Sequence, residues 1–248
     1  MILLIDIGNT HTHLGLGSNA RVSSQQNVRT DGWFDGATQH RLETFIQRRK
    51  IRGACFCSVV PRATRPCQEW LNRLGVPFVE LTSKTIQWIG IDYPKPKTIG
   101  PDRLANAVAA FKGFGAPSVV VDFGTAVTFD VVDGKGAYAG GIIAPGLSAM
   151  TDYLHEKTAL LPKIEIRDVR AVVGKNTRQA MLVGAVHGYR GLVRALIAEL
   201  KQELGARKLP VIATGGYARL MAKGLPEINA VDPNLTLLGL LWVFRASN

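Results

Sequence analysis

The sequence has few cysteines and few acidic side chains for its length. Its 248 residues include three cysteines, and 30 lysine and arginine side chains face 19 aspartate and glutamate side chains, which gives a formal charge of +11. Three cysteines in a chain of this length predict no disulfide framework and favour a reducing compartment. The Cys-x-Cys spacing of Cys55 and Cys57 has no matching His or Cys pair, so a structural zinc site is not expected.

Long apolar runs are also missing. Four apolar residues follow Met1 before Asp6 interrupts them, which is short of the roughly 7–15 residues of a signal-peptide core. The longest apolar stretch, LTLLGLLWVF at 235–244, falls short of the ~18 residues that span a bilayer. With 46% hydrophobic residues and 20% charged ones, the chain is neither disordered nor fibrous. We therefore expect a soluble cytoplasmic protein without a membrane partner.

The basic excess lies mostly in the first half of the chain. Residues 1–115 contain 15 basic and 8 acidic side chains, and residues 116–248 contain 15 and 11. One interpretation of the basic cluster is a surface that follows nucleic-acid phosphates, and the other is a solvated helix face. No interleaved aromatic residues, zinc finger or helix-turn-helix accompany it, so a nucleic-acid partner is not expected. The cluster comprises Arg48, Arg49, Lys50, Arg52, Arg62, Arg65 and Arg73.

The chain contains an internal repeat. Residues 2–10 are ILLIDIGNT and residues 119–125 are VVVDFGT, and each is an apolar run followed by Asp, one apolar residue, Gly and a small polar residue. A short apolar run that ends in a glycine turn predicts a buried strand. Asp6 and Asp122 are separated by 122 − 6 = 116 residues, about half the chain. The repeat predicts two duplicated domains, residues 1–115 and 116–248.

Strands and helices are expected in both halves. Hairpin patterns follow each repeat, and a helical period covers Asp102–Phe114. A long periodic helix is expected over 176–205, with Asn176 or Thr177 as its N-cap; Gly184, Gly188 and Gly191 suggest close helix packing or a break. The segment PVIATGGYARLMA predicts a further strand, turn and helix. The pattern favours an α/β protein with its ligand site in the crevice between the halves.

Two Asp-x-Gly turns behind buried strands have a chemical use. Glycine lets backbone N–H groups approach phosphate oxygens, and Asn9, Thr10 and Thr125 add side-chain donors. The Asp at each strand end can hold a cation that neutralises a polyphosphate. A third turn, Thr214-Gly215-Gly216, is a candidate to close over a nucleoside or phosphate. A nucleotide-phosphate site is therefore favoured over a purely structural duplication.

Seven motifs spread over nearly the whole chain carry a resemblance to a known family. In order they are DIGNT (6–10), YPKPKTIGPDRLANAVAA (93–110), VDFGTAVTFDVV (121–132), GGIIAPGLSAM (140–150), VVGKNTRQAM (172–181), IATGG (212–216) and DPNLTLLGL (232–240). With these motifs the chain resembles the type III pantothenate kinases, members of the actin, sugar-kinase and heat-shock-chaperone superfamily. The resemblance implies two duplicated RNase H-like (actin-like ATPase) domains with the active site in the cleft between them.

The resemblance also implies an activity: ATP-dependent phosphorylation of pantothenate to 4′-phosphopantothenate, the first step of coenzyme A biosynthesis. It implies that Asp6 lies near Mg²⁺, bound through water, and that Asp122 binds a monovalent cation, K⁺ or NH₄⁺. Some relatives have Lys where this chain has His13, which puts a direct phosphate contact there in question. The residues that match ATP-binding positions are Asp6, Ile7, Gly8, Asn9, Thr10, His11, Thr12, His13 and Thr125.

For pantothenate, the resemblance implies a catalytic residue and a set of contacts. Asp102 matches the proton acceptor, and Thr177 matches a contact reached across a dimer interface, so a homodimer with a shared substrate site is expected. ATP, pantothenate and the product are anions that a basic protein attracts. The matching substrate-binding positions are Tyr93, Gly100, Pro101, Asp102, Arg103 and Thr177.

Simpler interpretations of these residues stay open. Asp102 is also a favoured N-cap for a helix starting at Arg103, and Arg103 also fits a surface ion pair. Tyr93 precedes a proline, and packing explains it as well as substrate contact does. His11 and His13 form a His-x-His pair, but no third metal ligand is near in sequence.

Two other functions also stay open. One is a kinase of another small acceptor, such as a sugar. The other is a regulatory ATP-binding protein of the same fold that acts as a transcription accessory factor. The acceptor-side Asp102 argues against the second, because a switch has no need of such a base.

Overall fold

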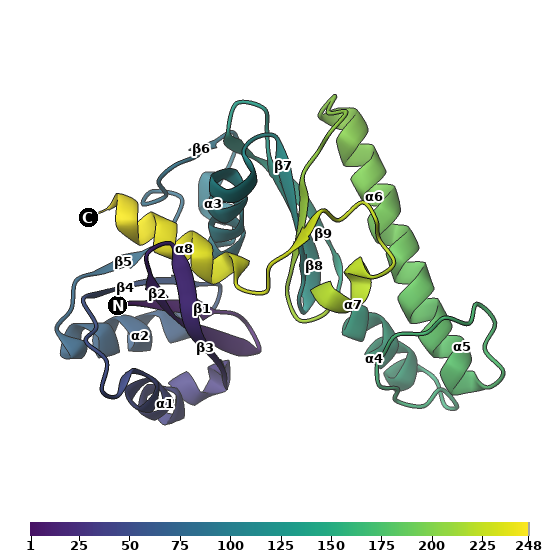
Figure 1. Cartoon of the computed structure of the whole chain (residues 1–248). Helices are drawn as coiled ribbons and strands as arrows, with labels where there is room; N and C mark the ends of the chain where they lie inside the picture. The colour runs from purple at the N-terminus through teal and green to yellow at the C-terminus, as the bar shows by residue number, and fades with distance from the viewer. Residues whose placement is uncertain (248) are drawn as a thin grey trace. The chain divides into compact units, whose positions relative to one another are not determined.

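The computed structural model describes residues 1–247, which form two compact units (Figure 1). Unit 1 contains residues 1–115, 136–140 and the segment from Asn234 onward. Unit 2 contains residues 116–135 and 141–233. The units and the domains predicted from the sequence share the division after Gly115, and they differ at 136–140 and at the C-terminal segment.

The sheet of unit 1 has the strand order β3-β2-β1-β4-β5. β1 pairs antiparallel with β2, which pairs antiparallel with β3, whereas β4 is parallel to β1 and β5 is parallel to β4. Leu3, Leu4 and Ile5 in the central strand are fully buried, as expected for a strand covered on both faces. The strands are β1 Ile2–Ile7, β2 His11–Ser18, β3 Arg21–Arg29, β4 Gly53–Ser58 and β5 Phe78–Glu80.

The second sheet repeats this order. It reads β11-β10-β7-β8-β9-β6, so β7 to β11 are arranged as β1 to β5 are, with β6 added at the edge. β7 pairs antiparallel with β8 and parallel with β10, as β1 does with β2 and β4. The duplication predicted from the two Asp-x-Gly motifs is confirmed. The strands are β6 Gly90–Ile91, β7 Ser118–Phe123, β8 Ala126–Val132, β9 Ala137–Pro145, β10 Val211–Thr214 and β11 Ala230–Val231.

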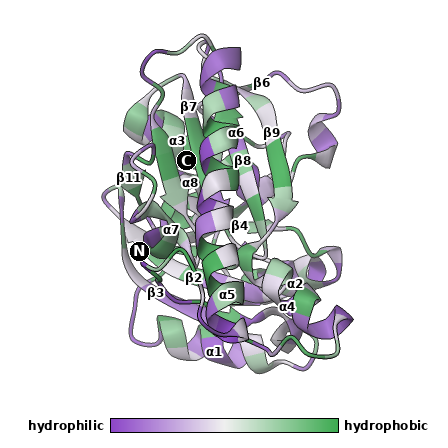
Figure 2. Ribbon diagram, turned by 90° about the vertical axis from the view of Figure 1, so that its right-hand side faces the viewer, coloured by the Kyte–Doolittle hydropathy of each residue, from purple (hydrophilic) through white to green (hydrophobic). Residues whose placement is uncertain are grey.

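Helices cover both sheets. Figure 2 shows mainly hydrophobic residues along β7 and β8 and a mixture of polar and apolar residues along α6, and Val193 and Ile197 of α6 join Val119 and Val121 in one buried core. The helices of unit 1 are η1 Thr30–Trp33, α1 Ala37–Ile46, α2 Pro61–Leu74, η2 Pro96–Thr98, α3 Pro101–Phe114 and α8 Leu235–Ala246. Those of unit 2 are α4 Leu147–Lys157, α5 Thr177–Val183, η3 Gly184–Gly188, α6 Tyr189–Glu203 and α7 Ala218–Ala222.

The long helix expected over 176–205 is present with an irregular centre. α5 continues into α6 through one π-helical turn, η3, at Gly184–Gly188. A Cβ atom built on Gly184, Gly188 or Gly191 meets nothing within 4 Å. Within residues 1–247, therefore, no other helix packs closely against these glycines.

The apolar stretch near the C-terminal end forms α8, which belongs to unit 1. α8 contacts α3, β1, β2 and β4, and Figure 1 shows it beside α3 and the first strands of the sheet. A Cβ on Gly239 would overlap the backbone of Ala105 in α3, so these two helices approach each other too closely for any larger residue. In residues 1–247, no helix combines the length and apolar character needed to cross a membrane.

This close approach predicts how replacing each of two helical glycines by alanine changes the stability of the protein. Gly239→Ala forces α8 away from α3 and should lower the melting temperature by roughly 5–10 °C, because overpacking costs about 1–3 kcal/mol in a chain of this size. Gly113→Ala in α3 is the control, since its Cβ meets nothing within 4 Å. Alanine there should stabilise the helix by up to about 1 kcal/mol. Equal melting temperatures for the two variants would contradict the packing described here.

Candidate functional site

The first Asp-x-Gly motif forms the turn between β1 and β2. Asp6 pairs with His13 of β2 and with Cys57 of β4, and the Gly8 N–H donates to the His11 carbonyl across the turn at 3.0 Å. The side chain of Asp6 is 9% exposed. The Cys57 thiol donates to Asp6 Oδ1 at 3.3 Å. The carboxylate is thus held on one side by a buried neighbour from the adjacent parallel strand.

Asp102 belongs to the same neighbourhood. Burial raises the pKa of the Cys57 thiol well above its usual value, and the charges of Asp6 and Asp102 raise that pKa further. Cys57 therefore stays a neutral thiol that can donate a hydrogen bond. Sequence reasoning missed Cys57, because its position beside Asp6 follows from the pairing of β1 with β4 and from no local motif.

Asp102 lies in the first turn of α3 without capping it. The helix begins at Pro101 with Gly100 as its N-cap, so the alternative in which Asp102 is the N-cap is wrong. Asp102 Oδ1 accepts a hydrogen bond from the Arg103 N–H at 2.8 Å, and a Cβ on Gly100 would lie 2.5 Å from that oxygen. Burial raises the pKa of Asp102, and the Arg103 N–H and guanidinium oppose the shift. The result is a carboxylate with increased affinity for a proton.

Two tyrosines and an arginine lie near the start of α3. The Tyr93 and Tyr138 rings meet edge to face with centroids 6.3 Å apart, and Arg103 Cζ is 5.8 Å from the Tyr138 ring centroid. Tyr138 is buried, whereas Tyr93 is 39% exposed. Tyr93 therefore packs against Tyr138 within unit 1 and keeps part of its side chain exposed. Tyr138 has no motif in the sequence that predicts this role.

The loop between β1 and β2 presents only some of its residues. Asn9, Thr10 and His11 are exposed, and Gly8 is half-buried. Ile7 and Thr12 are fully buried, so contact between either residue and a ligand would have to use the backbone. The ring Nδ1 of His13 is 2.8 Å from Asn27 Oδ1. Across residues 1–247, no three His, Cys, Asp or Glu side chains cluster as a metal site.

The second Asp-x-Gly motif forms the turn between β7 and β8 in unit 2. The Gly124 N–H donates to the Ala126 carbonyl at 3.1 Å, and Asp122 pairs with Thr214 of β10. Gly215 follows with φ +89°, and a Cβ there would overlap the Asp122 carboxylate. The third glycine turn thus packs directly on Asp122. Thr125 lies in the β7–β8 turn, three residues after Asp122.

Thr177 is exposed at the first position of α5. Asn176 is the N-cap, because its side-chain oxygen accepts the Gln179 N–H at 3.0 Å. Of the two N-cap candidates, Asn176 is correct, so the Thr177 hydroxyl is not the cap of its helix.

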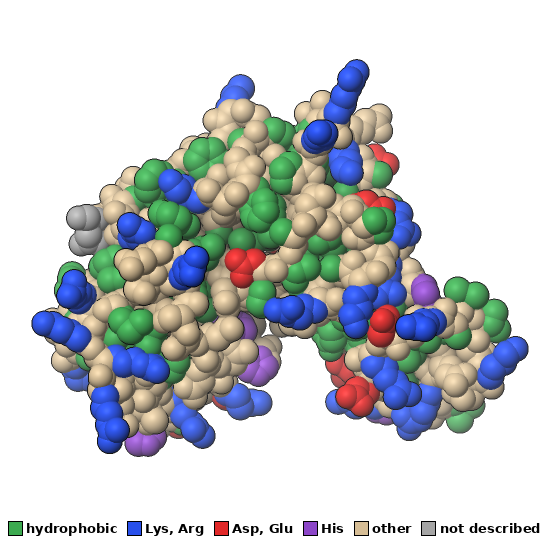
Figure 3. All heavy atoms as spheres, in the orientation of Figure 1, with side chains coloured by type: hydrophobic (Ala, Val, Ile, Leu, Met, Phe, Trp, Pro, Cys, Tyr) green, Lys and Arg blue, Asp and Glu red, His purple; other side chains and the backbone are tan. Residues whose placement is uncertain are grey.

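The positive charge is spread widely. On the face drawn in Figure 3, Lys and Arg side chains are distributed over both units and acidic ones are few. All seven residues of the basic cluster are exposed, and three of them, Arg62, Arg65 and Arg73, lie on α2. Arg65 is paired with Glu69 at 2.8 Å, and Arg62 lies over the Phe34 ring. These contacts are those of a solvated helix face.

The shifted pKa of Asp102 predicts how stability depends on pH. Its pKa is higher in the folded protein than in the unfolded chain, so the folded protein binds more protons between the two values, and stability falls as pH rises through that interval. Asp102→Asn removes this loss. In urea unfolding, the variant should gain stability relative to the parent as pH rises above about 4, the unfolded value.

Asp31→Asn is the control of opposite sign. The hydrogen bond from Arg29 lowers the pKa of Asp31, so this carboxylate stabilises the fold above its unfolded pKa and the effect is lost as pH falls. Its replacement should cost stability at neutral pH. An Asp102→Asn variant that loses stability as pH rises would contradict the direction of the shift.

Comparison with known proteins identifies the chain. The family described as type III pantothenate kinase matches residues 2–199. A type III pantothenate kinase of Akkermansia muciniphila is 45% identical over 238 residues, which cover 96% of each chain.

Two solved structures resemble the fold. A Campylobacter jejuni protein, provisionally named a Baf family transcriptional activator, gives a TM-score of 0.60 at 17% identity and covers 99% of this chain and 98% of its own. Component A of (R)-2-hydroxyglutaryl-CoA dehydratase from Acidaminococcus fermentans gives a TM-score of 0.52 at 15% identity and covers 100% and 99%. At these identities the likeness concerns the fold alone, which has the expected pair of RNase H-like domains. The family match and the close relative together show that this chain belongs to the type III pantothenate kinases.

Proposed function

We propose that this protein transfers the γ-phosphoryl group of ATP to the terminal hydroxyl of pantothenate, which yields 4′-phosphopantothenate in the first step of coenzyme A biosynthesis. Membership of the family supports the reaction. The structural observation that carries it is the packing of α3, which bears Asp102, against β4, the strand that places Cys57 beside Asp6. The charges of both carboxylates raise the pKa of the Cys57 thiol, in agreement with this packing. In the proposed reaction, Asp6 is the carboxylate on the ATP side and Asp102 is the base on the acceptor side.

The β1–β2 loop, Asp6 to His13, is the proposed site for the phosphates of ATP. Its exposed tip offers backbone N–H groups and the polar side chains of Asn9, Thr10 and His11. A single carboxylate suits Mg²⁺ held through water, because Mg²⁺ keeps several waters and takes its other ligands from phosphates. When bound, Mg²⁺ neutralises charge that develops on the phosphates. Asp6 is oriented for this role by the Cys57 thiol, and Thr125 supplies a further ATP contact.

Pantothenate is proposed to bind at the start of α3. Arg103 offers a cation for its carboxylate, and Gly100, Pro101 and the exposed part of Tyr93 line the approach. Asp102 accepts the proton of the hydroxyl as the bond to phosphorus forms. The increased proton affinity that burial gives Asp102 suits this role. Phosphoryl transfer depends mainly on alignment and charge neutralisation, which these residues can supply.

Asp122 is the proposed ligand of a monovalent cation. Its carboxylate lies near the end of β7, with Gly215 packed against it, and Thr125 follows three residues later in the turn. Carboxylate, hydroxyl and carbonyl oxygens are hard ligands, which suit K⁺ or NH₄⁺ better than a soft metal.

The active form is proposed to be a homodimer in which Thr177 contacts the pantothenate bound by the other chain. The exposure of Thr177 and the cap made by Asn176 leave its hydroxyl available for this contact. Unit 2 also exposes several large apolar side chains around α4 and the segment that follows, as expected for a surface that a second copy covers. These are Ile143, Met150, Tyr153, Leu154, Leu160, Val172 and Val173.

The proposed location is the cytoplasm. All three cysteines are unpaired thiols buried in unit 1, which suits a reducing compartment.

An activity assay with one variant tests the reaction. The purified protein with ATP, Mg²⁺, K⁺ and pantothenate should produce phosphopantothenate, whereas sugars offered as acceptors should not be phosphorylated. Asp102→Asn should lower kcat by about 10²–10⁴, the usual loss of a general base. Asp35→Asn, on the exposed segment before α1, is the control and should keep full activity. No product above a heat-killed sample would refute the proposed function.

Mixing two inactive variants tests the shared site. Asp102→Asn removes the base, and Thr177→Leu removes the hydroxyl and blocks its place. In a dimer whose sites draw on both chains, subunit exchange makes one intact site per heterodimer, so an equal mixture should recover about a quarter of the parent's activity. No recovery after verified exchange, or a fully active monomer in light scattering, would rule out the shared site.

A further inference from the structure

A chain of three hydrogen bonds runs behind the β1–β2 loop. It begins at the Trp33 indole N–H, which is 3.0 Å from Thr12 Oγ1. Thr12 Oγ1 is 3.1 Å from Thr30 Oγ1, and the Thr30 hydroxyl donates to the Gly8 carbonyl at 2.7 Å. Thr12, Thr30 and Trp33 are at most 2% exposed. The chain thus ends on the glycine of the first Asp-x-Gly motif.

Its two ends fix the direction of every bond. An indole N–H can only donate and a carbonyl oxygen can only accept. The Thr12 hydroxyl therefore accepts from Trp33 and donates to Thr30, and the Thr30 hydroxyl accepts from Thr12 and donates to Gly8. Each hydroxyl is left with one rotational position. The rigid side chains therefore also restrain the backbone at Gly8, whose carbonyl accepts the last hydrogen bond.

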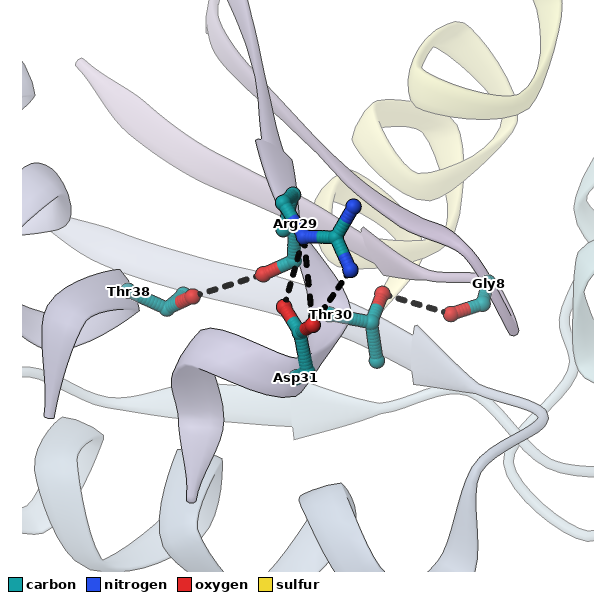
Figure 4. Close-up of polar contacts among 5 residues, drawn as sticks. All are labelled: Gly8, Arg29, Thr30, Asp31 and Thr38. Carbon is teal, nitrogen blue, oxygen red and sulfur yellow. Dashed lines mark hydrogen bonds and ion pairs between the residues drawn. The ribbon is translucent and has the colours of Figure 1, made fainter. Parts of the chain in front are cut away.

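The backbone of Thr30 holds the other side of the loop. Its N–H donates to the Thr10 carbonyl at 3.1 Å, while its side chain holds Gly8. Gly8 and Thr10 flank the exposed tip at Asn9, and both are fixed by this one buried residue. Figure 4 shows the Thr30 side chain directed at Gly8. A loop held in this way has little conformational entropy to lose when a ligand binds.

We infer that Thr30 is a positioning residue for ATP: with Thr12 and Trp33 it holds the phosphate loop in its binding conformation without touching the nucleotide. The inference rests on the proposed function, in which this loop receives the phosphates. Thr30 follows β3, and none of the seven motifs that carry the family resemblance contains Thr30 or Trp33.

Thr38 supplies a matched control. Its hydroxyl also donates to a backbone carbonyl, that of Arg29, at 2.9 Å, and it is 1% exposed. Figure 4 shows that Thr38 contacts Arg29, the residue before Thr30, on the side away from Gly8. Thr38→Val and Thr30→Val each remove one buried hydroxyl from the same region, but only the second releases the loop.

The first measurement is the dissociation constant of Mg²⁺–ATP. It is measured by calorimetry at a temperature well below the melting temperatures of Thr30→Val and Thr38→Val. Thr30→Val should raise it about tenfold, the equivalent of one lost hydrogen bond. Thr38→Val should change it less than about twofold, although both variants should melt earlier than the parent. Thr30→Ser keeps the hydroxyl and should bind ATP nearly as the parent does. The KM for ATP should follow the same order, and the KM for pantothenate should stay within about twofold in all variants.

The second measurement follows the Trp33 indole N–H directly. The chain has four tryptophans, so an NMR spectrum of protein with ¹⁵N-labelled tryptophan has four indole signals, and Trp33→Phe identifies the relevant one. Mg²⁺–ATP should shift this signal in the parent and in Thr38→Val. It should not shift in Thr30→Val, where the link to Gly8 is cut.

The outcomes separate this inference from the proposed function. If phosphopantothenate is made but Thr30→Val and Thr38→Val bind ATP equally well, Thr30 is merely structural and only this inference fails. If ATP binds as expected and no phosphopantothenate forms, the choice of acceptor fails and the role of Thr30 stands. A parent protein that does not bind ATP overturns both.

Discussion

The parallel pairing of β1 with β4 is the constraint on which the proposed site depends. It places Cys57 opposite Asp6 although 51 residues separate them in sequence, and it thereby supplies a buried donor to the carboxylate. The antiparallel pairing with β2 turns the chain back at Gly8 and exposes the loop tip. Both neighbours of β1 are therefore needed to fix one carboxylate and one loop, and the hydrogen bonds through Thr30 hold that loop from behind.

The two halves of the duplication use the same strand position differently. In unit 1 the neighbour of Asp6 on the parallel strand is Cys57, and in unit 2 the corresponding neighbour of Asp122 is Thr214. Both neighbours are buried. In unit 2 the next residue is Gly215, whose backbone packs on the Asp122 carboxylate. In unit 1 the next residue is Ser58, where β4 ends, and Val59 leads on towards α2. The repeated turn thus has two environments, and the two carboxylates are proposed to bind different cations.

The sequence predicts those parts of the fold that depend on local pattern. Continuous apolar runs predict β1 and β7, and the helical period predicts α3 apart from its first residue, where Pro101 rather than Asp102 begins the helix. The roles of Cys57, Thr30 and Tyr138 could not be predicted, because each depends on which strands or loops become neighbours. The position of α8 is similar: it is apolar on nearly all sides, so its pattern indicates burial without indicating the sheet it covers.

The packing of α8 also bears on how the protein is made. The helix that completes unit 1, α8, follows every element of unit 2 in the sequence, and Gly239 within it contacts α3 more closely than any side chain would allow. Domains of a growing chain usually fold from the N-terminus as they emerge from the ribosome. Here unit 1 lacks part of its core until α8 has been translated, and by then every element of unit 2 has been synthesised. Unit 1, whose synthesis begins first, therefore cannot complete its core until unit 2 has been synthesised.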